Sequence, residues 1–334
     1  MRYKIGHIKK GAFMISTYTA WSLFAFILLL GVITVNGFTD APTSITSSVT
    51  SKALTMRQAC VISAFFNFLG VILGSFLGFG VSSTVAQLGN NGSGKEMCAC
   101  LLTVIIFGLL TWLFRMPSSE SVALISALAA TSYFKTGDLN AKTLFPILLF
   151  TVLCCIMSFL LSMLSFLAIK KAPLNFRSLN IGLCSVSYFI HVWQDGGKLI
   201  GLFLILFKFS DTSKDFFAVL PCIFTVAIFL FLGTLLGGGR IVKELGENTV
   251  KLTEVSCAAS DIGCLLSLFV CTALGIPTST GYAKSTSIIG AGIGDKKKVN
   301  KKSALLQIVT CLITIPFCFV LGYFLCSLFQ KIGG

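Results

Sequence analysis

The segment GIPTSTGYAKSTSIIGAG (residues 275–292) has a counterpart in the first half of the chain, RMPSSESVALISALAA (residues 115–130). In both, a proline leads a cluster of Ser and Thr. Proline suits the first turn of a helix, and the hydroxyls and free N–H groups that follow can bind an anion at the positive end of the helix dipole. Taken singly, each segment could equally be an ordinary capped helix start, because Ser and Thr are favoured N-caps.

An isolated aspartate lies far upstream of each proline-led segment, Asp40 before the first and Asp195 before the second. Both aspartates and both clusters lie within or beside long apolar runs. Related halves with interrupted apolar segments at corresponding positions are typical of membrane transporters, which bind their substrate near the membrane midplane. The duplication therefore favours a transporter with a carboxylate and a hydroxyl-rich helix start in each half.

The composition indicates a membrane protein. Hydrophobic residues make up 55% of the chain and charged residues 11%, whereas about a quarter of the residues in a soluble domain are charged. The mean hydropathy is +0.91, which excludes a water-soluble globule. Apolar stretches long enough to cross a bilayer, about 20 residues each, are expected near residues 12–36, 58–83, 97–114, 143–169, 180–206, 216–237, 255–275 and 303–329.

These stretches are too continuous for the alternating pattern of a membrane β-barrel, so helices must satisfy the backbone hydrogen bonds. We therefore expect an all-α polytopic membrane protein. A polar, basic loop near residues 170–179 is the natural division between a first transmembrane repeat, residues 1–170, and a second, residues 171–334.

The net charge of +14 does not indicate a nucleic-acid partner, because the basic residues form short clusters outside the apolar runs. The main clusters lie at residues 2–10, 170–177 and 296–302. Such clusters prefer the cytoplasmic face, where the positive-inside bias and anionic lipid favour them. We expect the lipid bilayer of the cell membrane, and no nucleic acid, as the surroundings of this chain.

Polar residues inside the membrane are costly and therefore mark candidate functional positions. The first group is GFTDAPTSITSSVTSKALTMRQAC (residues 37–60), where an apolar run gives way to Asp40 and Pro42. Proline removes a backbone donor and disfavours helical geometry at the preceding residue. A helix break here would turn carbonyl groups and the Asp40 carboxylate toward a cavity, although an interfacial loop with an N-cap at Asp40 or Thr43 is the simpler alternative.

The second group is HVWQDGGKLIGLF (residues 191–203). Two adjacent glycines, Gly196 and Gly197, weaken a helix and predict a second opening of the backbone. The simpler alternative is an ion pair between Asp195 and Lys198, three residues apart on one helix face. His191 is more simply a hydrogen-bonded structural imidazole, although its near-neutral pKa is compatible with a proton relay.

Several segments together resemble the inorganic phosphate transporter (PiT) family of membrane symporters. The stretch at residues 35–74 is similar to the family pattern GANDVANSxGxxVxSxxLTxRQA, with Asp40 on its aspartate, and residues 191–201 are similar to HGxNDAQKxxG. PSSES (117–121) and PTSTG (277–281) resemble the two PxSTTH segments, and residues 237–261 resemble GGxRIxKxxGxxIxxLxPxxGFxAE. The resemblance extends from about residue 31 to the C-terminus.

The chain departs from the family pattern at several motif positions. Thr39 and Gln194 stand where the signature asparagines are expected, and Val122 and Tyr282 stand where PxSTTH ends in histidine.

The acidic residues of the motifs are altered as well. Asn67 and Asp261 replace the motif glutamates, and Glu120 is an added carboxylate inside the first anion cluster. Asn67 can offer an amide oxygen to Na⁺ but cannot carry a proton. Glu120 would repel phosphate unless it points away, is protonated or helps to bind a cation.

The resemblance implies an inverted repeat of two halves, with broken helices at Asp40 and Asp195 and re-entrant helical hairpins that begin near Pro117 and Pro277. The implied phosphate-binding residues are Ser118, Ser119, Ser121, Thr278, Ser279 and Thr280. The implied cation-binding residues are Asp40, Thr43, Gln194 and Asp195. Candidates for coupling or gating are Asn67, Glu120, His191, Lys198 and Asp261.

The expected function is import of inorganic phosphate by cation symport, with no catalytic residues and no cofactor besides the coupling ion. Na⁺ is favoured over H⁺ because the motif positions have lost ionisable groups while oxygen ligands remain. A sulfate permease on the same scaffold is the alternative, since both anions are tetrahedral. An intramembrane enzyme is a remote alternative, because no catalytic spacing appears. A homodimer is possible.

Overall fold

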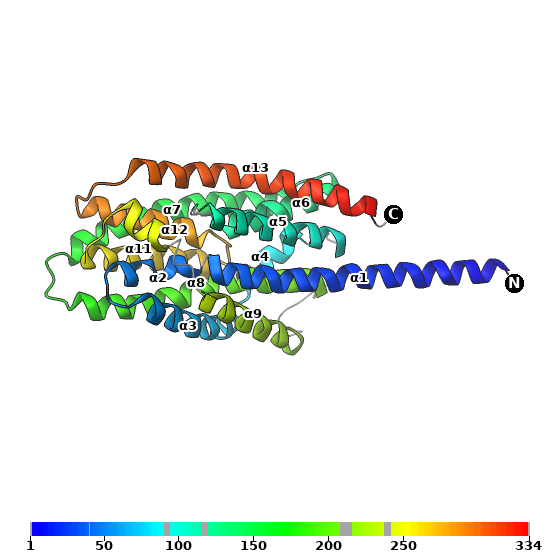
Figure 1. Ribbon diagram of the computed structural model, residues 1–334, viewed down its shortest axis with the longest axis horizontal. Coiled ribbons are helices and arrows are strands. Elements are labelled where there is room, and N and C mark those ends of the chain that lie inside the picture. Colours follow the sequence, from blue (N-terminus) through cyan, green and yellow to red (C-terminus); the bar gives the residue numbers. More distant parts are fainter. Residues whose placement is uncertain are drawn as a thin grey trace.

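The computed structural model describes residues 2–39, 41–89, 94–114, 116, 119–207, 216–236 and 242–332, and every regular element within them is helical. The helices form one elongated bundle (Figure 1). The elements are α1 (Arg2–Thr39), α2 (Ala41–Thr50), α3 (Met56–Leu77), α4 (Gly80–Gly89), α5 (Gly94–Leu113), α6 (Glu120–Thr136), α7 (Ala141–Ile169), α8 (Phe176–Phe207), α9 (Phe216–Leu236), the π-helix η1 (Glu244–Thr249), α11 (Glu254–Ala273), α12 (Thr280–Gly294) and α13 (Lys301–Ile332).

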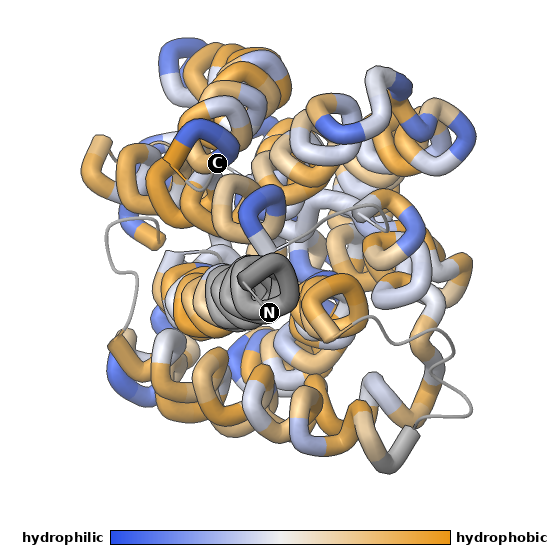
Figure 2. Tube along the Cα trace, turned by 90° about the vertical axis from the view of Figure 1, so that its right-hand side faces the viewer, coloured by the Kyte–Doolittle hydropathy of each residue, from blue (hydrophilic) through white to orange (hydrophobic). Residues whose placement is uncertain are grey.

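Eight segments of the described chain are long and apolar enough to cross a membrane, as the hydropathy pattern predicts. Large apolar side chains such as Leu113, Phe145 and Leu312 are exposed, and apolar residues run along the outer helices (Figure 2). Many hydroxyl, amide and charged side chains are instead buried. Because lipid is the only surrounding in which such an exterior is stable, the molecule is a multi-pass protein of the membrane.

The last long helix of each half packs against helices of the other half. α7 closes the first half and packs against α11 and α12 of the second, whereas α13 closes the second half and packs against α5 and α6 of the first. Each half therefore covers the short helix that the other contributes, and neither half forms a separate core. The same packing in both directions agrees with two related halves.

Helices α6 and α12 are the short elements that follow the proline-led clusters. With 17 and 15 residues they are shorter than the roughly 20 residues that a full crossing needs. Their first residues, Glu120 and Thr280, are 5% and 0% exposed. Both helices therefore begin inside the bundle, as the re-entrant hairpins predict.

The break predicted at the first aspartate falls at an element boundary, since α1 ends at Thr39 and α2 begins at Ala41; Asp40 itself lies outside the described residues. The break predicted at Gly196 and Gly197 is wrong, because α8 runs through both glycines without interruption. A Cβ on Gly196 would lie 3.0 Å from Val71 Cγ2, and one on Gly197 would lie 3.0 Å from Val81 Cβ. These glycines let α3 and α4 approach α8 closely, so neighbouring helices compensate for the weak local helix propensity.

Two of the three basic clusters lie on the same side of the bundle. The loops at residues 170–175 and 295–300, which carry exposed lysines, are both at the end opposite the C-terminus (Figure 1). This arrangement agrees with the expected common face for these two clusters. For residues 2–19 the structure describes the helical backbone alone, so the face of the basic cluster at residues 2–10 stays a prediction.

Candidate functional site

α8 carries an ion pair into the middle of the bundle. Lys198 Nζ lies 2.7 Å from Asp195 Oδ1, and the side chains of both residues are 3% exposed. His191 Nε2 lies 3.0 Å from Asp195 Oδ2, one helical turn away. α8 is the most buried of the eight candidate spans. Its His191, Asp195 and Lys198 side chains therefore lie in an apolar environment, where each polar group needs a partner.

Lys198 joins the two proline-led segments. Its ammonium donates hydrogen bonds to Ser121 Oγ at the start of α6 and to the Thr278 carbonyl oxygen before α12, both at 2.6 Å. These residues come from opposite halves of the chain. The structure therefore brings together the two segments whose similarity first indicated a common site.

Both helix starts have the same cap. Ser119 Oγ accepts a hydrogen bond from Val122 N at 3.3 Å, and Ser279 Oγ accepts one from Tyr282 N at 3.1 Å. Ser119 and Ser279 are 0% and 1% exposed. Two helix dipoles thus direct their positive ends toward the neighbourhood of Lys198, which is favourable for an anion.

The second-half residues form a linked set around Asp195. Thr280 Oγ1 donates to Asp195 Oδ1 and Oδ2 at 3.3 Å each. Gln194 Nε2 donates to Thr278 Oγ1 at 2.7 Å and to the Ile276 carbonyl oxygen at 3.0 Å. Gln194 therefore orients the chain that leads into α12, and its amide is engaged there in this conformation.

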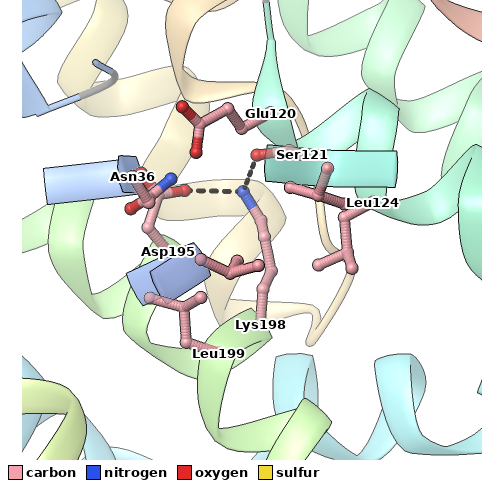
Figure 3. Close-up of a pocket in the computed structure, with 9 residues that line it drawn as sticks. Asn36, Glu120, Ser121, Leu124, Asp195, Lys198 and Leu199 are labelled. Atoms are coloured by element: carbon pink, nitrogen blue, oxygen red, sulfur yellow. Dashed lines mark hydrogen bonds and ion pairs between the residues drawn. The ribbon is translucent and has the colours of Figure 1, made fainter. Parts of the chain in front are cut away.

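A small cavity opens beside the ion pair (Figure 3). Its polar lining consists of Asn36, Glu120, Ser121, Asp195 and Lys198, and its apolar lining consists of Val32, Val104, Leu124 and Leu199. The Glu120 carboxylate is directed toward the same space as Asp195 and Lys198 (Figure 3).

Glu120 is held in this position by the residue at the first signature-asparagine position. The Thr39 hydroxyl contacts Glu120 Oε1 and lies 2.7 Å from the Val35 carbonyl oxygen. Glu120 therefore does not point away from the predicted anion cluster. Its position agrees with the other two possibilities stated above, a protonated carboxyl group or a carboxylate that helps to bind a cation.

The charges and dipoles at this cavity suit a pair of oppositely charged ions. Two carboxylates, Glu120 and Asp195, and the Asn36 amide supply oxygen atoms for a cation. Lys198, the hydroxyls and the two helix starts supply donors for an anion. In a low-dielectric site a bound cation strengthens anion binding, because their mutual attraction is poorly screened.

Three predicted coupling candidates do not line this cavity; of these, His191 contacts Asp195, whereas Asn67 and Asp261 lie elsewhere. Asn67 donates from Nδ2 to Thr234 Oγ1 at 2.9 Å, between α3 and α9. Asp261 is paired with Lys284, between α11 and α12. Thr43 is buried on α2, and Asp40 and Ser118 lie outside the described residues.

Sequence inspection missed Asn36 and Lys284. Asn36 lies inside an apolar run, four residues before Asp40. Lys284 lies within the second proline-led segment, among residues that are mostly uncharged. The signal in both cases was a polar side chain in a membrane helix, which is expensive enough to require an explanation.

The Phosphate transporter family model matches this chain twice, over residues 36–178 and 170–322. The chain belongs to the phosphate transporter family. The resemblance drawn from the motifs is thereby confirmed, and so is the presence of two related halves, since one model fits both. The exact division at residue 170 stays a prediction.

Curated members of the phosphate transporter family are similar over most of the chain. A protein of Rhizobium meliloti (strain 1021), named probable low-affinity inorganic phosphate transporter, is 31% identical over 291 residues, which cover 80% of this chain and 86% of the relative. A protein of the same name from Bacillus subtilis (strain 168) is 29% identical over 309 residues, covering 86% and 91%. These relatives are named as transporters and not as enzymes, in agreement with the expectation from the motifs.

A solved structure titled "The sodium-dependent phosphate transporter" has the same fold. It matches with a TM-score of 0.78 over 94% of this chain and 100% of that chain, at 15% sequence identity. The all-α, multi-pass architecture expected from the sequence is therefore confirmed.

Proposed function

We propose that this protein is a secondary active transporter that imports inorganic phosphate by symport with a cation, Na⁺ in preference to H⁺. The observation that carries the proposal is Lys198, whose ammonium contacts both proline-led segments and Asp195 at once. Family membership supports phosphate as the substrate. The name of the neighbouring structure supports sodium for that protein.

Phosphate would bind between the starts of α6 and α12. The proposed donors are the Lys198 ammonium, the helix N–H groups and the hydroxyls of the two segments, namely Ser118, Ser119, Ser121, Thr278, Ser279 and Thr280. In the present conformation Lys198 spans the space between Ser121 and Thr278. An incoming phosphate would take over these contacts, because a charged oxygen is a stronger acceptor than a hydroxyl or a carbonyl.

The carboxylates beside Lys198 favour phosphate over sulfate. At neutral pH phosphate retains at least one proton, so Asp195 or Glu120 can accept a hydrogen bond from it. Sulfate has no proton at this pH and would meet the same carboxylates only as like charges. This difference argues against the sulfate permease that the sequence alone leaves open.

The cation would lie near the carboxylates of the cavity. Asp195 is the central proposed ligand. The motif resemblance suggests Asp40, Thr43 and Gln194 as further ligands, and Glu120 is a further candidate because it lines the same cavity. A sodium ion at this position would lower the electrostatic cost of bringing phosphate next to two carboxylates. Each ion would then raise the affinity for the other, which is the thermodynamic basis of symport.

Uptake into proteoliposomes tests this proposal directly. Labelled phosphate should accumulate when an inward sodium gradient is applied, and replacement of sodium by choline at fixed pH should reduce uptake at least tenfold. Full uptake in choline that rises as the external pH falls would assign the coupling to protons, with His191 as the first candidate carrier. Excess unlabelled sulfate should compete poorly, and equal competition by sulfate and phosphate would contradict the assigned substrate.

A further inference from the structure

A second lysine is buried away from the cavity. Lys284 lies one helical turn after Thr280 on α12 and is 2% exposed. Its ammonium contacts Asp261 Oδ1 on α11 and donates to Ser47 Oγ on α2 at 2.7 Å. The proposed transport mechanism does not use this lysine.

The residues around the Lys284 ammonium are of the kind that bind a metal cation, a buried carboxylate and a hydroxyl. Asp261 is 0% exposed, and Ser47 is also fully buried. Among the residues that the structure describes, Asp261 Oδ2 has no hydrogen-bond partner, although Oδ1 is paired with the ammonium. A buried carboxylate with a spare oxygen beside a hydroxyl is a strong attractor for a positive charge.

The neighbouring groups are neutral and already engaged with one another. Ser48, next to Ser47 on α2, lies 3.3 Å from the Tyr188 hydroxyl, and Cys184 Sγ lies 3.0 Å from the same hydroxyl. These contacts close one side of the site without adding charge. The positive charge at Asp261 is therefore supplied by Lys284.

The contacts of Lys284 parallel those of Lys198. Each ammonium contacts one aspartate of the second half and one serine of the first half, Asp195 and Ser121 for Lys198 and Asp261 and Ser47 for Lys284. Lys198 opens onto the cavity with Glu120. Lys284 on α12 instead contacts two neighbouring helices, α11 and α2, where its fixed charge balances Asp261 without an ion from solution.

We propose that the Lys284 ammonium is a tethered counter-cation that takes the place of an exchangeable Na⁺ at Asp261 and Ser47. A tethered charge cannot be released on the other side of the membrane. Asp261 then contributes no transported ion, and the protein binds one cation fewer than it would with an uncharged residue at position 284. The consequence for transport stoichiometry rests on the proposed function, whereas the binding site itself does not.

Replacement of Lys284 by methionine tests the proposal, because methionine keeps the length of the side chain and removes its charge. Purified protein in detergent is assayed for equilibrium binding of radioactive sodium without phosphate. Lys284→Met should bind one more sodium per chain than the wild type. The double variant Lys284→Met, Asp261→Asn should lose this additional ion, because the carboxylate that attracts it is neutralised.

Thermal unfolding supplies a second measurement. The unfolding midpoint of Lys284→Met should be lower than that of the wild type in choline chloride and should recover when sodium replaces choline at equal ionic strength. Lys135→Met, a charge removal at an exposed position of α6, should show the wild-type response to sodium. Lys284→Gln provides a polar substitute if the methionine variant is poorly folded.

The proposal is overturned if Lys284→Met binds the same number of sodium ions as the wild type. It is also overturned if both Lys284→Met and Lys284→Gln fail to fold in sodium, since a site that Na⁺ can fill should accept it in at least one of them. A wild type that transports no phosphate would contradict the proposed function alone. An added sodium in Lys284→Met would still support the tethered counter-cation in that case.

Discussion

Lys198 and Asp195 meet where α6, α8 and the chain entering α12 converge. A lone buried charge would be costly, but here each charged group has a close partner and additional polar contacts. The ion pair that the sequence offered as a simple structural alternative is present. It also lies beside the hydroxyls of both proline-led segments, so a structural role and a binding role are not exclusive for these two residues.

Replacement of Lys198 by methionine should weaken phosphate binding strongly. The loss of a charge-assisted hydrogen bond, worth roughly 1.5 to 3 kcal/mol, corresponds to an increase of about 10- to 100-fold in the half-saturating phosphate concentration. The measurement is labelled phosphate uptake at equal membrane abundance. Lys135→Met serves as the matched control and should leave uptake unchanged; an unaltered half-saturation in Lys198→Met would place the anion elsewhere.

Asp195→Asn should abolish sodium-driven uptake while the protein remains inserted in the membrane. The substitution removes the charge that balances Lys198 and attracts the cation, and it alters the acceptor of Thr280. Uptake is compared across a range of sodium concentrations with Asp138→Asn, which changes an exposed aspartate in the loop after α6. Near-normal uptake with an ordinary sodium response would show that Asp195 has no part in cation binding.

At the scale of the helices, close approach of backbones shapes the bundle. α7 crosses α11 and α12 at two glycines. A Cβ on Gly263 would lie 2.4 Å from Ser162 N, and one on Gly290 would lie 2.2 Å from the Phe159 carbonyl oxygen. Membrane helices pack through such small residues, because lipid provides no hydrophobic drive for their association.

Gly290→Ala should therefore lower stability although alanine is the better helix former. The added methyl group meets backbone atoms that cannot move aside independently, and overpacking of this kind costs about 1 to 3 kcal/mol. Gly182→Ala is the matched control, since its Cβ would meet nothing within 4 Å. That substitution should be neutral or stabilise α8 by up to about 1 kcal/mol. Thermal unfolding in detergent compares them, and equal midpoints would contradict the close crossing.

At the scale of the whole molecule, the basic loops predict the orientation in the membrane. The loops at residues 170–175 and 295–300 lie together at one end of the bundle, and α13 leads from that end to the C-terminal end of the chain (Figure 1). Lysines of both loops are exposed. The positive-inside bias favours this end on the cytoplasmic side and the end of α13 on the opposite side.

Fusions of reporter proteins after Ile332 check this orientation. Alkaline phosphatase, which is active only outside the cytoplasm, should be active there, and green fluorescent protein exported through the general secretion pathway should be dark. Both reporters inserted after Lys171 should behave in the opposite way. A fluorescent C-terminal fusion would mean that the basic loops face outward and that the charge bias does not orient this protein.

The chain's local patterns were sufficient for its class, its eight apolar spans and the pairing of its two proline-led segments. Hydropathy over some twenty residues and the preference of proline, serine and threonine for helix starts are local properties, so they could be inferred before any contact was known. Together with the motifs, these patterns led to four of the five polar residues that line the cavity, namely Glu120, Ser121, Asp195 and Lys198.

Contacts between distant segments required the folded molecule. Gly196 and Gly197 suggest a broken helix in isolation, yet packing against Val71 and Val81 keeps α8 continuous. Ser47 and Lys284 are 237 residues apart in sequence and share a hydrogen bond. The physical reason is that the cost of burying a charge depends on what surrounds it, and those surroundings are assembled from helices of both halves only when the bundle closes.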